Sequence, residues 1–308
     1  MNSIADALAA GTTSVSLVGI ATLDSPPKPS SNGNLGFWLK LRDATYAGGI
    51  SVGYYRPDAE AVWQSLQGVE IPVVAVRGNV SRKKDLSVFA DRLQRVDTSP
   101  EPYMPQPAIP VEVSWAEIVA AAGRIESEPL RRVTEHLLQQ RDREFRRWAA
   151  ATSYHEPTLG GLAEHTARML RAAERDIEEY GAPEPYPSRL RAGVIWHDIG
   201  KVLTYGPPPQ NQYLPEEDLF SHSLTGCLVL VDLCRSEGLF YKWWQEPDIR
   251  ALLHMIASHH GQKDWGALVE PRTPEAKALH VIDLYESRRA HSELARREGH
   301  PAYDELGV

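Results

Sequence analysis

The chain has 308 residues, of which 42% are hydrophobic and 24% are charged, and its formal net charge at pH 7 is −8. This composition is ordinary for a globular protein and excludes wholesale disorder and a fibrous repeat. The negative charge also argues against a protein that coats nucleic acid through bulk electrostatics. At roughly 100 to 200 residues per domain, the length predicts two domains.

Neither a membrane helix nor a secretory signal is expected. The apolar run at 15–23 is interrupted by polar and glycine residues, and it is about half as long as the roughly 20 residues that a membrane helix needs. No basic segment precedes it. Cys227 and Cys234 lie in an apolar stretch, which suggests packing rather than a disulfide or a thiolate metal site. We therefore expect a cytoplasmic protein with no membrane contact.

Charge and histidine are distributed unevenly along the chain. Residues 1–100 carry ten Lys or Arg and nine Asp or Glu, whereas the remaining residues carry 23 and 32. All eleven histidines lie at or after His136. This asymmetry predicts two parts with different chemistry.

The first part is predicted to form short strands separated by Pro, Gly, Asn and Asp turns. One short helix, at about 58–66, is expected between the third and fourth strands. Five strands with a helix at this place are the order of an OB-fold, a small all-β barrel that often binds oligonucleotides. The expected strands are 14–22, 35–43, 49–55, 71–82 and 85–96.

Alternation along the second strand suggests a face that binds nucleic acid. Phe37, Leu39 and Leu41 would point into the barrel, and the residues between them would point outward. An outward aromatic ring and positive charges suit single-stranded nucleic acid, because bases stack on the ring and phosphates follow the charge. A solvated face with a chance tryptophan is the alternative interpretation. The candidate nucleic-acid-binding residues are Trp38, Lys40, Arg42, Tyr55, Lys83 and Lys84.

Five prolines between Ser99 and Val111 predict an extended linker. From Trp115 onward, apolar residues recur at three- and four-residue spacing, which predicts helices. The expected organisation is an OB-fold domain at 1–98, a Pro-rich linker at 99–113 and an all-α domain at 114–308.

Histidine and aspartate recur on the inward faces of the predicted helices, where burial is costly unless the groups are paired or bind a metal. Imidazole and carboxylate without thiolate suit a divalent ion such as Mn, Fe or Zn. Any one of these histidines alone would more simply be a core or surface residue. A single tetrahedral site would leave several without a role, so two ions bridged by Asp198 explain the pattern better. The candidate metal ligands are His165, His197, Asp198, His222, His254, His259 and Asp283.

Four short motifs resemble those of the HD-domain superfamily of metal-dependent phosphohydrolases. They are Gly160-Gly-Leu-Ala-Glu-His165, Trp196-His-Asp-Ile-Gly-Lys201, Ser258-His-His-Gly261 and His280-Val-Ile-Asp283. With an N-terminal OB-fold added, the chain is similar to the YhaM-type 3′-to-5′ exoribonucleases over about residues 35–285, including Tyr154-His-Glu156 and Trp265-Gly266. The polarity of digestion is implied by this resemblance alone.

The resemblance also implies roles for individual residues. The implied ligands of one ion are His165, His197, Asp198 and Asp283, and those of the other are Asp198, His222 and His259. His260 is implied near the second ion, His254 next to the metals, and Lys201 at the substrate phosphate, which makes Asp198, Lys201 and His260 the candidate catalytic residues. A solvated lysine at a helix end is the alternative for Lys201.

One departure from the resemblance concerns the substrate contacts. After Asp283 the family usually continues with Asn-Leu-Asp-Ala-Lys, whereas this chain has Leu284-Tyr-Glu-Ser-Arg288. The metal carboxylate is kept, but we expect the substrate contacts near it to differ.

The predicted function is a metal-dependent 3′-to-5′ exonuclease that hydrolyses single-stranded RNA, or DNA as well, by a two-metal mechanism. Two divalent ions per chain are expected, with Mn²⁺ favoured over Fe, Zn, Co, Ni or Mg. Three alternatives stay open: a nucleotide or cyclic-dinucleotide phosphohydrolase whose OB-fold serves assembly, an HD-type diiron oxygenase, and a nucleic-acid-binding protein with a structural metal site. The sequence is also compatible with a homo-oligomer.

Overall fold

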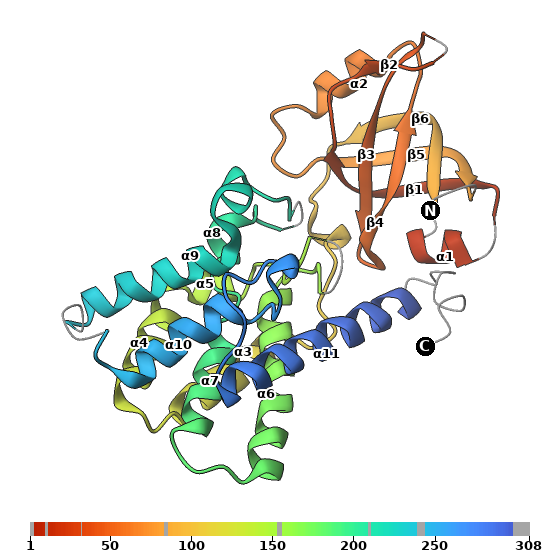
Figure 1. Cartoon of the computed structure of the whole chain (residues 1–308). Coiled ribbons are helices and arrows are strands. Elements are labelled where there is room, and N and C mark those ends of the chain that lie inside the picture. Colours follow the sequence, from red (N-terminus) through yellow and green to blue (C-terminus); the bar gives the residue numbers. More distant parts are fainter. Residues whose placement is uncertain are drawn as a thin grey trace. The chain divides into compact units, whose positions relative to one another are not determined.

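The computed structural model describes residues 3–9, 12–31, 33–82, 86–152, 156–208, 211–238 and 244–297. These residues form two compact units, whose elements are labelled in Figure 1. The first unit contains the residues up to 106 together with 292–297, and the second contains residues 107–291. The division falls inside the segment that the sequence predicts as a linker. Within the described ranges, no helix has the length and apolar character needed to span a membrane.

The first unit is a closed barrel of five long strands, in agreement with the predicted OB-fold. The strands are β1 (Ser14–Leu23), β2 (Lys28–Pro29), β3 (Leu35–Asp43), β4 (Tyr46–Tyr54), β5 (Val73–Ser81) and β6 (Ser87–Val96). They pair in the order β1, β5, β6, β4, β3, β2, and pairing of β1 with β3 closes the barrel. Strands β4 and β6 are parallel, and the other pairs are antiparallel.

Helix α2 (Ala59–Leu66) connects β4 to β5, at the place that the sequence predicts. Its buried residues Ala59, Trp63 and Leu66 recur with helical spacing and therefore lie on one face. Trp63 packs against Phe37 of β3, with ring centroids 5.1 Å apart. Two small elements are absent from the sequence prediction: the two-residue β2 and helix α1 (Ile4–Ala9).

The second unit is helical, as predicted. Its elements are α3 (Val111–Gly123), α4 (Glu128–Gln140), α5 (Asp142–Phe145), α6 (Gly161–Tyr180), α7 (Tyr186–Trp196), α8 (Lys201–Thr204), α9 (Pro215–Ser236), α10 (Pro247–Ser258), the 3₁₀ turn η2 (Lys263–Trp265) and α11 (Pro274–Arg297). Helices α3, α4, α6, α7, α9, α10 and α11 all contribute apolar side chains to one core.

Helix α7 is the central element of this core and fixes the place of the site. Its fully buried Trp196 donates the indole N–H to Thr134 Oγ1 at 3.1 Å. Gly193 allows close packing, because a Cβ atom there would lie 2.1 Å from Met255 Cε of α10. The chain therefore leaves α7 at a fixed point inside the protein, where His197 and Asp198 follow directly.

Candidate metal centre

Three side chains from different helices form what we call the first group. His165 lies on α6, His197 follows α7, and Asp283 lies on α11. Their ligand atoms all lie within 4.8 Å of one another. His165 Nε2 is 3.3 Å from Asp283 Oδ1, and both histidines are fully buried. The fold thus brings together three residues that the sequence proposes as ligands of one ion.

A second group consists of His222 on α9 and the pair His259 and His260 after α10. Their ligand atoms also lie within 4.8 Å of one another. His222 Nε2 and His260 Nε2 face each other at 2.9 Å. His222 and His259 are buried, whereas His260 is partly exposed. The fold therefore brings a ring nitrogen of His260 within 4.8 Å of those of His222 and His259, which lie within the same distance of each other.

Asp198 lies between the two groups and faces both. Its Oδ2 atom is 3.2 Å from His197 Nε2 of the first group. Its Oδ1 atom is 3.6 Å from His222 Nε2 and 3.7 Å from His259 Nε2 of the second group. Asp198 thus turns one carboxylate oxygen toward each of the two histidine groups.

The buried imidazoles of His197 and His259 are oriented in the same way. His197 Nδ1 donates to Val194 O and His259 Nδ1 donates to Ile256 O, each at 2.8 Å. In the described part of the chain, the opposite Nε2 atom of each ring is buried without a hydrogen-bond partner. A histidine that ligates a metal characteristically donates its other N–H to a carbonyl or carboxylate. The donor set and these two atoms therefore fit a divalent metal.

Two carboxylates that the sequence analysis does not single out hold the remaining histidines. Glu217 accepts a hydrogen bond from His222 Nδ1 at 2.8 Å. Glu156, which is 7% exposed, has its Oε2 atom 3.5 Å from His165 Nδ1. Both contacts leave Nε2 of the ring directed at its group. Glu156 belongs to the Tyr154-His-Glu156 motif, whereas no pattern in the sequence points to Glu217.

A bend in α9 brings Glu217 beside His222. Ser221 has φ 55° and ψ 154°, which interrupts the helix between these two residues. On a straight helix, five residues correspond to a rotation of roughly 140° from the starting direction, so Glu217 and His222 would point to different sides. Gly200 permits close approach of the same segment, because a Cβ atom there would lie 1.9 Å from His222 O.

Lys201 is buried beside the carboxylate of Asp198. It is 5% exposed, and its Nζ atom donates to Asp198 Oδ2 at 2.6 Å and to Ala150 O at 2.7 Å. The alternative of a solvated lysine at a helix end is therefore wrong. The ammonium group places positive charge next to the atoms of Asp198 that face the first group.

The electrostatics favour the protonation states that bind metal. Burial raises the pKa of Asp198, but the adjacent His197 and Lys201 hold it well below its usual value. Burial likewise opposes ionisation of Asp283, but its contact with His165 lowers its pKa. Burial lowers the pKa of His259, and it lowers that of His260 to about 4. Ionised carboxylates and neutral imidazoles are the forms that coordinate metal ions.

His165 differs from the other imidazoles in its charge. Burial lowers its pKa, but the carboxylates of Asp283 and Glu156 outweigh that effect and raise it to about 10. A metal bound at the first group would have to displace a proton from this imidazole, because histidine coordinates in its neutral form.

The structure places His254 apart from both groups. It lies on α10, and its Nε2 atom accepts a hydrogen bond from the backbone N–H of Arg272 at 2.9 Å. Five helical residues separate it from His259, so the two side chains point roughly 140° apart around the axis. The resemblance implies that His254 ligates a metal or supports a ligand, and in the structure its Nε2 atom is engaged by the backbone of Arg272.

On the barrel, Trp38 is part of a partly exposed aromatic cluster. Its ring centroid lies 5.5 Å from that of Phe89 and 6.3 Å from that of Tyr55. The cross-strand position opposite Trp38 is Gly53, where a Cβ atom would approach the indole to 3.0 Å. Phe89 is 47% exposed and is not recognised in the sequence analysis, although it alternates with the buried residues of β6.

Two of the predicted cations on the barrel differ in their placement. Lys40 is half-buried on β3. Arg42 is only 4% exposed, because its side chain donates to Ala47 O at 3.1 Å and to Thr22 Oγ1 at 2.9 Å. The side chain lies on the same face as Lys40, since a Cβ atom at Gly49 would approach the Cγ atoms of both, but these hydrogen bonds hold it against the barrel. Lys83 and Lys84 lie outside the described residues.

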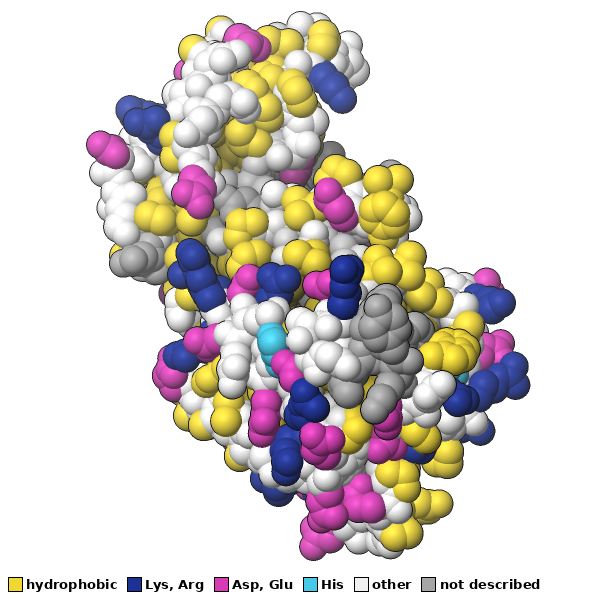
Figure 2. Space-filling model, turned by 90° about the vertical axis from the view of Figure 1, so that its left-hand side faces the viewer, with side chains coloured by type: hydrophobic (Ala, Val, Ile, Leu, Met, Phe, Trp, Pro, Cys, Tyr) yellow, Lys and Arg dark blue, Asp and Glu magenta, His cyan; other side chains and the backbone are white. Residues whose placement is uncertain are grey.

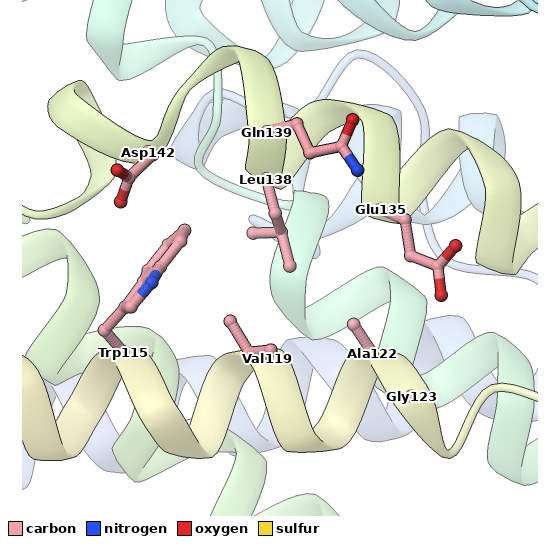
Figure 3. Close-up of a pocket in the computed structure, with 8 residues that line it drawn as sticks. All are labelled: Trp115, Val119, Ala122, Gly123, Glu135, Leu138, Gln139 and Asp142. Carbon is pink, nitrogen blue, oxygen red and sulfur yellow. The ribbon is translucent and has the colours of Figure 1, made fainter.

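A hollow of about 470 Å³ lies between α3 and α4 and is lined by residues outside both histidine groups (Figure 3). None of the residues predicted for the site is among those that line it. The lining residues are Trp115, Val119, Ala122, Gly123, Glu135, Leu138, Gln139 and Asp142.

Comparison with protein families agrees with this geometry. Residues 162–288 match the family model of the HD domain. The matched range lies within the helical unit, and it contains both histidine groups together with Asp198 and Lys201.

The chain is also similar to curated proteins named 3′-5′ exoribonuclease YhaM. It is 32% identical to that of Bacillus pumilus (strain SAFR-032) over 159 residues, which cover 52% of this chain and 48% of the relative. It is 31% identical to that of Bacillus subtilis (strain 168) over 159 residues, with the same shares of 52% and 48%. The match to that of Geobacillus sp. (strain WCH70) is 32% over 159 residues, or 52% of this chain and 47% of the relative. The matched stretch spans about half the length of these relatives.

Proposed function

We propose that this protein is a metal-dependent 3′-to-5′ exoribonuclease that hydrolyses phosphodiester bonds at the end of single-stranded RNA. The observation that carries the proposal is the position of Asp198, which turns one oxygen toward each of two histidine groups. The HD domain and the similarity to YhaM proteins supply the reaction class and the polarity.

The proposal includes two divalent ions, with Mn²⁺ favoured. His165, His197, Asp198 and Asp283 would hold one ion, and Asp198, His222, His259 and His260 would hold the other. Such a pair of ions supplies an activated water and neutralises charge on the phosphate. Glu156 and Glu217 keep the rings of His165 and His222 turned toward the ions.

Lys201 is proposed to bind the scissile phosphate. An ammonium group has three donors, and in the described part of the chain two of them contact Asp198 and Ala150. A third donor is left for a non-bridging phosphate oxygen, where it stabilises the negative charge that develops during hydrolysis. Burial strengthens this contact because the lysine is shielded from water.

The barrel is proposed to hold the strand upstream of the reacting end. Trp38, Tyr55 and Phe89 offer rings for base stacking, and Lys40 offers charge for the phosphates. On the face shown in Figure 2, Lys and Arg side chains lie among Asp and Glu side chains rather than in one continuous basic surface. Affinity for RNA should therefore depend more on stacking than on a broad electrostatic field.

The test compares substrates of different length on the purified protein with Mn²⁺. Single-stranded RNA oligonucleotides, mononucleotides and a cyclic dinucleotide are offered separately, and released nucleotides are quantified. The proposal expects hydrolysis of the oligonucleotides with a much higher kcat/KM than for either small substrate. Preference for a mononucleotide or the cyclic dinucleotide would instead indicate a small-nucleotide phosphohydrolase with the barrel as an assembly module.

A further inference from the structure

The segment that follows His259 and His260 is a tight turn at 261–267, which we call the histidine turn. The backbone N–H of Gly261 donates to Ser258 O at 2.8 Å and that of Ala267 donates to Gln262 O at 3.1 Å. Trp265 N and Gly266 N also donate within the turn, each at 3.0 Å. These bonds give the segment one defined conformation.

Glycines at both ends hold the histidine turn against the second group. Gly261 has φ +81° and Gly266 has φ +100°, which favour glycine over other residues. A Cβ atom at Gly261 would lie 2.3 Å from the ring of His280. His280 Nδ1 in turn donates to His259 O at 2.8 Å. The turn and the metal-binding histidines are therefore parts of one rigid arrangement.

The histidine turn presents an indole at the surface beside this arrangement. Trp265 is 49% exposed, and its ring centroid lies 6.2 Å from that of His280. A Cβ atom at the neighbouring Gly266 would lie 3.9 Å from His260 Cδ2. The indole lies outside the hydrophobic core formed by the described helices. A large apolar ring thus lies beside His280, on the turn that follows His260, and is half in water.

We propose that Trp265 is a stacking platform for the base of the 3′-terminal nucleotide, and this rests on the proposed function. A base stacked on an aromatic ring beside the second group would leave its phosphate near Asp198 and the histidines. Stacking tolerates any sequence because every base has a π face, which suits an enzyme that removes successive nucleotides. The rigid turn reduces the entropy lost when the ring becomes ordered against the base.

The experiment measures kcat and KM of Trp265→Ala, Trp265→Phe and the parent protein on two RNA strands. One strand ends in an ordinary nucleotide and the other ends in an abasic ribose. Trp244→Ala is the matched control, since Trp244 is 65% exposed and its ring lies below Arg250 Cζ, 6.0 Å from it. The bound metal of each variant is counted by mass spectrometry to detect a merely structural effect.

Trp265→Ala should raise KM for the ordinary strand about 10- to 100-fold, which is the usual range for loss of one stacked base. For the parent protein, KM should be higher for the abasic strand than for the ordinary strand by a similar factor. For Trp265→Ala, KM for the abasic strand should equal that of the parent protein. Trp265→Phe should restore most of the affinity, and Trp244→Ala should behave as the parent. All variants should bind the same amount of metal.

Two kinetic results would overturn the inference, and a binding result would do so as well. In one, Trp265→Ala affects the ordinary and the abasic strand by the same factor, and in the other it loses bound metal. Binding is also measured by fluorescence anisotropy with Asp198→Asn as background. Absence of hydrolysis by the parent protein contradicts the proposed function, whereas equal binding of the two strand ends by Asp198→Asn contradicts base stacking by Trp265.

Discussion

His222 Nε2 lies 3.6 Å from Asp198 Oδ1, and this short distance depends on the bend of α9 at Ser221. The bend turns the first residues of α9 so that Glu217 reaches the other nitrogen of the same ring at 2.8 Å. The imidazole of His222 is thereby held between the carboxylates of Asp198 and Glu217. This arrangement makes the second group sensitive to residues that do not touch its ligand atoms.

Glu217→Gln should weaken metal binding at the second group by about 10- to 100-fold, the range found when the partner of a metal-binding histidine is changed. The neutral amide accepts the hydrogen bond from His222 less strongly than the carboxylate does. Titration of the metal-free protein with Mn²⁺, followed by calorimetry, measures the change. Glu216→Gln removes the same charge from an exposed neighbour. The affinity of each of the two groups for metal should therefore stay unchanged.

Substitution of the ligands should change the metal content in a defined way. His197→Ala should lose the ion of the first group and His259→Ala that of the second, because each removes a buried Nε2 atom directed at its group. His254→Ala should keep both ions, since His254 Nε2 is engaged by Arg272 N. Elemental analysis of the purified variants decides, and a loss of metal in His254→Ala would contradict the placement of that residue.

Gly200→Ala should destabilise the protein by about 1 to 3 kcal/mol, the usual cost of overpacking. The new methyl group would meet the backbone at His222 O, which cannot move without displacing His222 from Asp198. Urea unfolding should therefore show a lower free energy of unfolding, and the bound metal per protein should fall. Gly123→Ala is the control, because a Cβ atom at that position of α3 has no heavy atom within 4 Å. Its stability should stay the same or rise.

One OB-fold holds roughly 4 to 16 nucleotides. Trp38→Ala and Phe89→Ala should each weaken the binding of longer RNA strands by about 1 to 3 kcal/mol. Short substrates that reach only the metal centre should be hydrolysed as before. Filter binding and kcat/KM for the two lengths give the comparison. Gln94→Ala, at an exposed position further along β6, is the control. An equal loss on short and long strands would contradict the assignment of this face.

The sequence predicts the barrel at nearly its observed bounds, because strands with one buried face repeat every two residues and are separated by turn residues. The same alternation places Arg42 on the face of Lys40, but it does not show that hydrogen bonds to Ala47 O and Thr22 Oγ1 bury the side chain. Those partners lie on β4 and β1, which a pattern within one strand does not contain.

Most residues of the two histidine groups are also predictable, because they lie in short motifs of fixed spacing, whereas His222 lies in none of the four motifs. Glu217 is not predictable from its position, since a straight helix would direct it away from His222 and the bend arises at Ser221, a residue with no sequence signal for positive φ. His254 is the opposite case, because a histidine near a motif suggests a ligand, whereas the helix turns it toward Arg272. In both cases the local backbone geometry determines which way the side chain of Glu217 or His254 points.

The account depends most directly on Asp198 as the residue shared by both groups. The decisive measurement is a time course with Mn²⁺ on matched 5′-labelled single-stranded RNA and DNA, run for the parent protein and for Asp198→Asn. The account predicts a ladder that shortens from the 3′ end of RNA with the parent protein, no shortening with Asp198→Asn, and nearly equal binding of the strand by both. Shortening by Asp198→Asn at the parent's rate, or cleavage by neither protein while both ions are bound, would contradict it.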